Sequence, residues 1–181
     1  PSIAEPQKAL PMAEDQRGVV EFRDVSFHYP DGDEDVLEHI SFTARPGETT
    51  AIIGSTGSGK STLINLIPRL YDATGGQVLV GGVDISQQNL QTLRKSIGFV
   101  PQKGLLFSGT IESNIKFSDE SLSDEAMKKA ASIAQATEFI ESNSLGYSRS
   151  IAQGGTNVSG GQKQRLSIAR ALAGDPDILI F

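Results

Sequence analysis

Two short runs near the start of the chain alternate apolar and polar residues. They are VVEFRDVSFHY, residues 19–29, and HISFTAR, residues 39–45. Successive side chains of a strand point to opposite faces, so this period predicts two half-buried strands of an antiparallel layer. The acidic stretch PDGDEDV between them predicts an exposed turn. It does not match a calcium-binding loop, because Val36 and Phe42 stand where such a loop needs glycine and glutamate.

The next segments follow the patterns of a mixed α/β protein. The short apolar run TTAIIG, residues 49–54, is typical of a central parallel strand that is covered on both faces. KSTLINLIPRL, residues 60–70, carries apolar side chains at helical spacing. GGQVLVGG, residues 75–82, and SIGFVPQ, residues 96–102, predict two further strands between turns.

Two longer helices are predicted in the second half of the chain. Residues 123–142 begin with Ser123, which can cap a helix. Residues 160–174 form the second helix, with Gly174 at its close. The expected apolar side of the first helix consists of Ala126, Ala130, Ile133, Ala134 and Ile140. Because strands alternate with helices, the expected fold class is α/β, with a parallel sheet core, an N-terminal antiparallel subdomain and a helical insert.

Composition excludes several classes of function. The chain has 38% hydrophobic and 21% charged residues, which is ordinary for a globular domain. Its net charge of −6, with scattered basic residues, argues against a nucleic-acid partner. There is no cysteine and there are two histidines, which excludes disulfides and thiol chemistry and argues against zinc. No apolar segment is long enough to cross a bilayer and no signal-peptide pattern is present, so we expect a soluble chain.

Both ends of the sequence suggest a piece of a larger protein. Residues 1–17 contain three prolines and no periodicity, which predicts a linker from an upstream domain. At the other end, DPDILIF stops within an apparent buried strand. We therefore expect the chain to be a fragment.

A glycine-rich loop joins the run TTAIIG to the helix that starts near residue 60. Gly54, Gly59, Lys60 and Ser61 match the pattern G-x-x-x-x-G-K-[ST]. Glycine allows successive backbone N–H groups to turn inward around a phosphate oxygen, with Lys60 in reach of the β- and γ-phosphates and the Ser61 hydroxyl able to ligate Mg²⁺. The loop predicts a nucleoside triphosphate site rather than a flexible turn. Its predicted binding residues are Gly54, Ser55, Thr56, Gly57, Ser58, Gly59, Lys60, Ser61 and Thr62.

Three further features narrow the type of nucleotide-binding protein. VSGGQ, residues 158–162, opens the second long helix and is followed by KQRLSIARAL. This stretch closely resembles the signature motif of ABC-type ATPases. FVPQ, which ends at Gln102, resembles the Q-loop of that family. Tyr29 lies ahead of the glycine loop, where the family has an aromatic residue that stacks on adenine.

The resemblance covers about residues 18–181 and implies an ABC ATP-binding domain. It implies that ATP and Mg²⁺ are bound, that Lys60 and Gln102 are catalytic, and that Ser61 and Gln102 hold the metal. It also implies that two such domains, as a homo- or heterodimer, pack head to tail. The residues expected to contact the ATP of the partner are Ser159, Gly160, Gly161 and Gln162.

Within the family, the sequence looks like an exporter. The stretches that carry this resemblance are RLYDATGGQVLVGGVDI, LQTLRKSIGFVPQ and LLFSGTIESNI. The expected organisation is a linker at 1–17 and a partial ATP-binding domain at 18–181, with a helical subdomain at about 103–157. The resemblance implies that closure on ATP and hydrolysis power export by a transmembrane domain, with this domain at the cytoplasmic face.

The chain also departs from the family pattern. Family members continue the strand DILIF with an Asp that orders Mg²⁺ and a Glu that polarises water. We therefore expect ATPase activity from the intact parent and at best nucleotide binding from residues 1–181 alone. Val158 replaces the usual leucine of the signature. Gln153 stands where many exporters carry glutamate, which fits either an unequal heterodimer or sequence drift.

Two alternatives to an exporter stay open. A soluble ABC ATPase that acts on DNA or ribosomes predicts a basic face or a long coiled-coil insert. A regulatory nucleotide-binding module without turnover predicts that residues other than Asp-Glu follow the strand.

Overall fold

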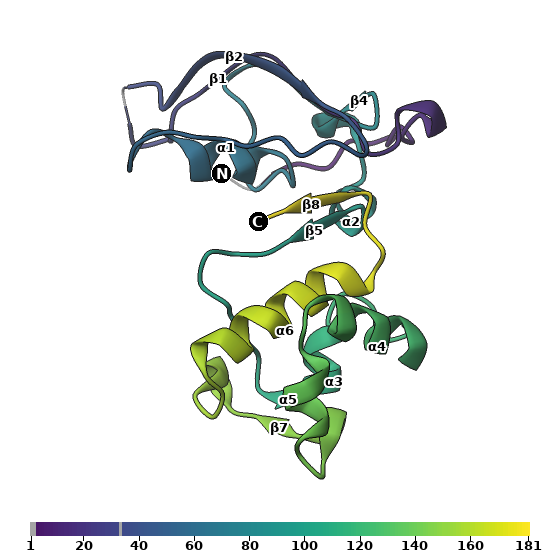
Figure 1. Ribbon diagram of the computed structural model, residues 1–181. Coiled ribbons are helices and arrows are strands. Elements are labelled where there is room, and N and C mark those ends of the chain that lie inside the picture. Colours follow the sequence, from purple (N-terminus) through teal and green to yellow (C-terminus); the bar gives the residue numbers. More distant parts are fainter. Residues whose placement is uncertain (1–2, 33) are drawn as a thin grey trace. The chain divides into compact units, whose positions relative to one another are not determined.

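The computed structural model describes residues 3–32 and 34–181. Asp33 of the acidic turn and the first two residues of the predicted linker lie outside the described residues. The chain forms two compact units, one up to Arg94 and one from Lys95 to Phe181 (Figure 1). No helix among the described residues has both the length and the apolar character that crossing a membrane requires.

An antiparallel sheet forms the framework of the first unit, with strand order β2-β1-β3-β4. Val20 pairs with Ala44, and Phe22 pairs with Phe42, whose ring stacks on it at 4.7 Å between centroids. The predicted antiparallel layer is confirmed, with strand ends shifted by one or two residues. The strands are β1 Val20–Phe27, β2 Leu37–Ala44, β3 Gly75–Val80 and β4 Val83–Asp84. The helical elements are η1 Glu14–Gln16, α1 Lys60–Leu66, η2 Ile85–Gln87 and, at the boundary, α2 Leu90–Lys95.

The predicted strand at residues 49–54 is wrong, because the structure has no strand there. Ile52 and Ile53 are 38% and 91% exposed. A strand is defined by backbone hydrogen bonds to a neighbour, and residues 49–54 join no ladder with any described strand. An apolar run between turns shows that a segment can be buried, but it does not supply the neighbouring strand.

The segment before β1 makes specific contacts with the first unit. The Leu10 N–H donates to the carbonyl of Gln87 at 2.8 Å. The Ala4 carbonyl accepts a hydrogen bond from Arg69 Nη2 at 3.1 Å. The described part of residues 1–17 is therefore held against the unit, and its role as a linker stays a prediction.

Helix α1 ends earlier than the sequence pattern predicted. The expected helix ran to Leu70, which is 45% exposed. Arg69 has a left-handed φ of 52°, and the Leu70 N–H donates to the carbonyl of Asn65 at 3.0 Å. These are features of a Schellman motif, in which glycine usually occupies the left-handed position. Arg69 in that position explains why the sequence showed no stop signal.

The second unit combines a parallel strand pair with a group of helices. β5, Ile97–Phe99, pairs in parallel with β8, Ile178–Ile180. β6, Gly109–Thr110, pairs antiparallel with β7, Ser150–Ile151. The helices are α3 Ile111–Ile115, α4 Asp124–Ile133, α5 Thr137–Glu141 and α6 Gly160–Ala173, with short turns η3 Gly146–Ser148 and η4 Gln153–Gly155.

The helix predicted over residues 123–142 is interrupted. Ser123 caps α4 as expected, since its side chain accepts a hydrogen bond from the Ala126 N–H at 3.1 Å. Gln135 then has φ of 56°, and the Ala136 N–H donates to the carbonyl of Ala131 at 2.8 Å. This is a second Schellman motif without glycine, and α5 starts after it.

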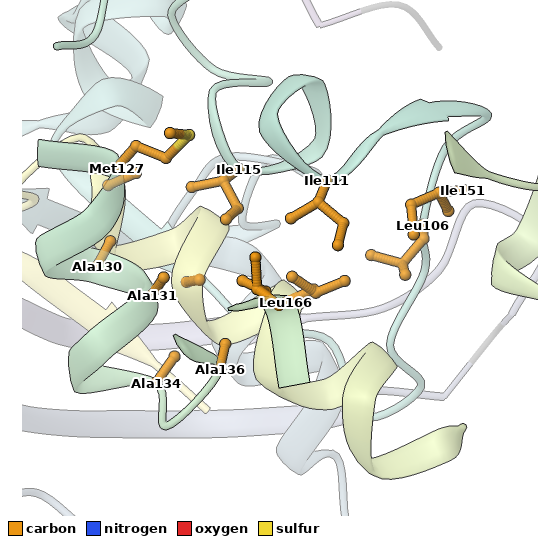
Figure 2. Close-up of a cluster of buried hydrophobic side chains, with 13 residues drawn as sticks. Leu106, Ile111, Ile115, Met127, Ala130, Ala131, Ala134, Ala136, Ile151 and Leu166 are labelled. Carbon is orange, nitrogen blue, oxygen red and sulfur yellow. The ribbon is translucent and has the colours of Figure 1, made fainter. Parts of the chain in front are cut away.

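The core of the second unit lies between α3, α4 and α6. Figure 2 shows Met127, Ala130 and Ala131 of α4 in one buried cluster with Ile115 of α3 and Leu166 of α6. Burial of Ala130, Ala134 and Ile140 confirms part of the predicted apolar side, whereas Ile133 is 57% exposed and was wrongly included. The buried cluster consists of Leu106, Ile111, Ile115, Met127, Ala130, Ala131, Ala134, Ala136, Ile140, Ile151, Leu166, Ala169 and Ala173.

Candidate functional site

The loop ahead of α1 has a shape that requires glycine. A Cβ on Gly54 would lie 2.5 Å from Ser58 Oγ. Gly59 caps α1 with φ of 83°, and a Cβ there would lie 2.9 Å from the carbonyl oxygen of Val36. L-residues with side chains rarely adopt this left-handed conformation. The backbone therefore requires glycine at Gly59, whereas at Gly54 the close contact is with the side chain of Ser58.

The side chain of Lys60 folds back over this loop. Its ammonium donates to the carbonyl oxygens of Gly54 and Ser55, at 2.8 and 2.7 Å, and to Ser58 Oγ at 3.3 Å. A lysine ammonium has three donors, and here all three face atoms of the loop. The structure thus brings a positive charge to the turn that the glycines shape. Ser61 lies next to it in the first turn of α1 and is exposed.

Tyr29 lies beside the helix that follows the loop. Its hydroxyl is 2.9 Å from Oγ1 of Thr62, a residue that is 6% exposed. The predicted adenine-stacking residue and the predicted phosphate-binding segment are therefore neighbours, although they are separated by 33 positions in the sequence. Sequence analysis did not assign a role to Tyr71, whose ring lies 5.4 Å from that of Tyr29. The only signal for Tyr71 was its aromatic character in the stretch RLYD.

Gln102 lies in the second unit, three residues after β5, and is exposed. The segment that follows it packs on α6. A Cβ on Gly104 would lie 3.1 Å from the backbone carbonyl of Lys163 and from Ser167 Oγ. Leu106 is buried in the core of the unit. The chain after Gln102 is thus attached to the helix that begins at the signature residues.

Arg170 holds this attachment and was missed by sequence analysis. Its guanidinium donates to the carbonyl oxygens of Leu105 and Asn114, at 2.9 and 2.8 Å, and to Asn114 Oδ1 at 2.7 Å. It also lies over the rings of Phe107 and Phe117, 5.0 and 5.6 Å from their centroids. Burial lowers the pKa of the Arg170 guanidinium from its usual value. These contacts join Arg170 to segments of the chain that are far from it in the sequence, so no short stretch of sequence reveals them.

The signature residues form the N-terminus of α6. Ser159 Oγ accepts from the Gln162 N–H at 3.2 Å, and Gln162 Oε1 accepts from the Ser159 N–H at 3.1 Å. This reciprocal pair is a capping box. Gly160 and Gly161 are exposed, and beyond the adjacent backbone no heavy atom in the described part of the chain lies within 4 Å of a Cβ built on either. Unlike the loop of the first unit, this helix start contains glycines that its own chain does not require.

The predicted site residues thus fall into two groups. Tyr29 and the loop at 54–62 belong to the first unit, and Gln102 and residues 159–162 belong to the second. The two predicted metal ligands, Ser61 and Gln102, are divided between these groups. Within the described residues, no cluster of three or more His, Asp or Glu side chains is placed to hold a metal ion.

A family model described as ABC transporter matches residues 37–181, which is well over half of the chain. The chain belongs to the ABC transporter family. It is an ATP-binding domain of this family, and the identification made from the glycine loop and the signature motif is confirmed.

Several characterised and uncharacterised ABC proteins are similar to this domain. An uncharacterized ABC transporter ATP-binding protein of Mycobacterium tuberculosis is 48% identical over 167 residues, which are 91% of this chain and 28% of that protein. A probable multidrug resistance ABC transporter ATP-binding/permease protein of Bacillus subtilis is 47% identical over 171 residues, 94% of this chain and 25% of that protein. The ATP-dependent lipid A-core flippase of Aromatoleum aromaticum is 46% identical over 165 residues, 91% of this chain and 28% of that protein. The chain therefore spans between a quarter and a third of the length of these relatives.

A solved structure extends the similarity from sequence to fold. A bacterial Atm1-family ABC exporter with ATP bound matches with a TM-score of 0.90 and 36% sequence identity, covering 98% of this chain and 31% of that chain. The predicted ABC ATPase fold is confirmed by this match.

Proposed function

We propose that this domain binds Mg-ATP, closes against a second ABC domain and hydrolyses ATP to drive export of a substrate across a membrane. The observation that carries the proposal is the position of Lys60 in the glycine loop. Its ammonium lies 2.8 and 2.7 Å from the carbonyl oxygens of Gly54 and Ser55, in a turn where glycine is required. A loop of this kind binds a polyphosphate through backbone N–H groups and a lysine.

Each residue of the loop has a role in this proposal. Lys60 donates to the β- and γ-phosphate oxygens, for which it exchanges its contacts with the loop carbonyls. Gly54 leaves room for Ser58 within the loop, and Gly59 allows the left-handed turn into α1. Tyr29 contacts the adenine ring.

The oxygen atoms that the chain offers fit Mg²⁺. The Ser61 hydroxyl is exposed beside Lys60, and the exposed Gln102 side chain carries an amide oxygen. Mg²⁺ is bound by few protein oxygens together with phosphates and water, so a hydroxyl and an amide suit it. When bound, Mg²⁺ neutralises negative charge that develops on the phosphates during transfer. Ser61 and Gln102 hold the ion, and Lys60 and Gln102 act in catalysis.

The open start of α6 supports a site shared with a second domain. Glycine in a helix is less stable than alanine by about 1 kcal/mol. Gly160 and Gly161 lie in the first turn of α6, and beyond the adjacent backbone no atom of the described residues lies within 4 Å of a Cβ built on either. Close approach of a triphosphate held by a second ABC domain, identical or different, gives these glycines a function. Ser159 and Gln162 then face the same ligand.

The membrane part of the proposal rests on the relatives. Two of them are named as a permease and a flippase, and this chain covers 25% and 28% of their lengths. A domain of this kind in an exporter lies at the cytoplasmic face, where ATP is available. Residues 1–17 connect it to the transmembrane domain, residues 18–181 are the ATP-binding domain, and residues 103–157 are its helical subdomain.

Binding of Mg-ATP to the chain, measured by titration calorimetry, tests this function. Lys60→Ala removes the charged donor and is expected to weaken binding roughly 10- to 100-fold, the usual range for a charged hydrogen bond. Lys129→Ala is the matched control, since Lys129 is an exposed residue of α4. Equal affinities of wild type and Lys60→Ala contradict the proposed site.

A further inference from the structure

Tyr29 is held on several sides by other residues of the first unit. Its ring lies 5.0 Å from that of Phe27 and 5.4 Å from that of Tyr71, with interplanar angles of 84° and 88°. Phe27 and Tyr71 also contact each other, at 5.6 Å between centroids. The hydroxyl of Tyr29 is 2.9 Å from Thr62 Oγ1. A nucleobase would stack parallel to the Tyr29 ring. Neither neighbouring ring does so.

The two partners Thr62 and Tyr71 belong to one continuous piece of chain. Thr62 lies in the first turn of α1, directly after Lys60 and Ser61. Tyr71 follows the motif that ends α1, in which the Leu70 N–H donates to the Asn65 carbonyl. Tyr29 is therefore contacted both by the helix that carries Lys60 and by the turn that follows this helix.

The turn that carries Tyr71 is itself firmly held. Arg69 is 4% exposed, and its Nε donates to Asp72 Oδ1 at 2.6 Å. Arg94 donates to the carbonyl oxygens of Pro68 and Arg69, both at 3.0 Å. Tyr71 lies between Arg69 and Asp72, so these contacts hold the backbone on both sides of it.

We propose that Thr62 and Tyr71 are positioning residues for Tyr29, which fix its ring relative to Lys60 so that one ATP molecule meets the base contact and the phosphate contacts together. This inference rests on the proposed function and goes beyond it, because it assigns part of the affinity for the nucleobase to residues that do not touch the nucleotide base. A ring that is held in place loses little conformational entropy on binding. The arrangement recognises an aromatic base on a triphosphate, and the phosphates alone do not depend on it.

Tyr71→Leu tests the role of the second ring. The variant is expected to weaken Mg-ATP binding roughly 3- to 10-fold, the range for loss of one aromatic pair. Binding of inorganic tripolyphosphate with Mg²⁺, measured in the same way, is expected to stay unchanged. Tyr71→Phe keeps the ring and is expected to bind ATP as the wild type does.

Tyr29→Phe and Thr62→Val test the hydroxyl pair in a double-mutant cycle. Each variant removes one hydroxyl of the 2.9 Å contact and keeps the size of the side chain. Each is expected to weaken ATP binding several-fold, and the double variant is expected to bind no worse than the weaker single variant. Tyr147→Phe is the matched control, because the buried hydroxyl of Tyr147 has no partner among the described residues.

The outcomes separate this inference from the proposed function. Wild-type ATP affinity in Tyr71→Leu, or equal losses for ATP and tripolyphosphate, overturns the positioning role. Additive losses in the double variant overturn the hydroxyl pair. In each of these cases the proposed function stands as long as the wild type binds ATP and Lys60→Ala binds it roughly 10- to 100-fold more weakly. Failure of the wild type to bind either ligand defeats the proposed function itself.

Discussion

The loop at residues 54–59 and residues 159–161 both place serine and glycine at the start of a helix. In the loop, contacts with the chain itself require glycine: a Cβ on Gly59 would lie 2.9 Å from the Val36 carbonyl. At the start of α6, a Cβ on Gly160 would meet nothing within 4 Å. Similar composition thus has two physical causes. The first segment is shaped by contacts within its own fold, and the second lies in open space, where we propose that a ligand approaches.

The largest effect is expected from Gly59→Ala. The substitution places an L-side chain at φ of 83° and against the Val36 carbonyl. The left-handed conformation and the overpacking together are expected to lower the free energy of unfolding by roughly 2–5 kcal/mol. Urea denaturation followed by circular dichroism measures this loss. A variant as stable as the wild type would show that the chain does not require glycine at this position.

A smaller effect is expected from Arg170→Ala, which tests how α6 is joined to Leu105 and Asn114. The variant removes a half-buried cation that donates to the Leu105 carbonyl, to the Asn114 carbonyl and to Asn114 Oδ1. Hydrogen bonds of a charged group contribute about 1.5–3 kcal/mol, and a loss of this size is expected in urea denaturation. Arg165→Ala, at an exposed position of α6, is the matched control and is expected to leave stability unchanged.

Removing the cap of α6 is expected to cost less. Ser159→Ala deletes the side-chain oxygen that accepts from the Gln162 N–H. The loss expected from the free energy of unfolding is ~1 kcal/mol, the usual value for a cap residue. Ser159→Asp restores an acceptor at the cap and is expected to recover most of the stability. If both variants are equally unstable, the capping box does not explain the role of Ser159 in the fold.

The smallest effect on stability is expected from Gly160→Ala. Because the surrounding space is open, the variant is expected to be as stable as the wild type or more stable, by up to about 1 kcal/mol. ATP binding to the chain is expected to stay unchanged, since Gly160 does not belong to the loop at 54–62. In the native protein, the proposed ATP hydrolysis is expected to fall. Unchanged hydrolysis would leave the open glycines without the proposed role.

Local signals in the sequence were sufficient to identify the family and to predict a nucleotide site at the glycine loop. The glycine loop with Lys60 and Ser61 spans eight residues, and the cap of α6 depends on Ser159 and Gln162, three positions apart. Such patterns are encoded in short windows, because the groups that interact are neighbours in the chain. The family and the binding loop could therefore be predicted from the order of the amino acids alone.

Only the tertiary structure decided which distant segments meet. The contacts of Tyr29 with Thr62 and of Arg170 with Leu105 join residues 33 and 65 positions apart. The missing strand at residues 49–54 has the same cause, because a strand needs a partner that lies elsewhere in the chain. Periodicity reports which face of a segment is apolar, and it contains no information on the neighbour that covers this face. The sequence by itself determined where the glycine loop and α6 lie. Packing decided that Tyr29 contacts α1 and that the chain after Gln102 contacts α6.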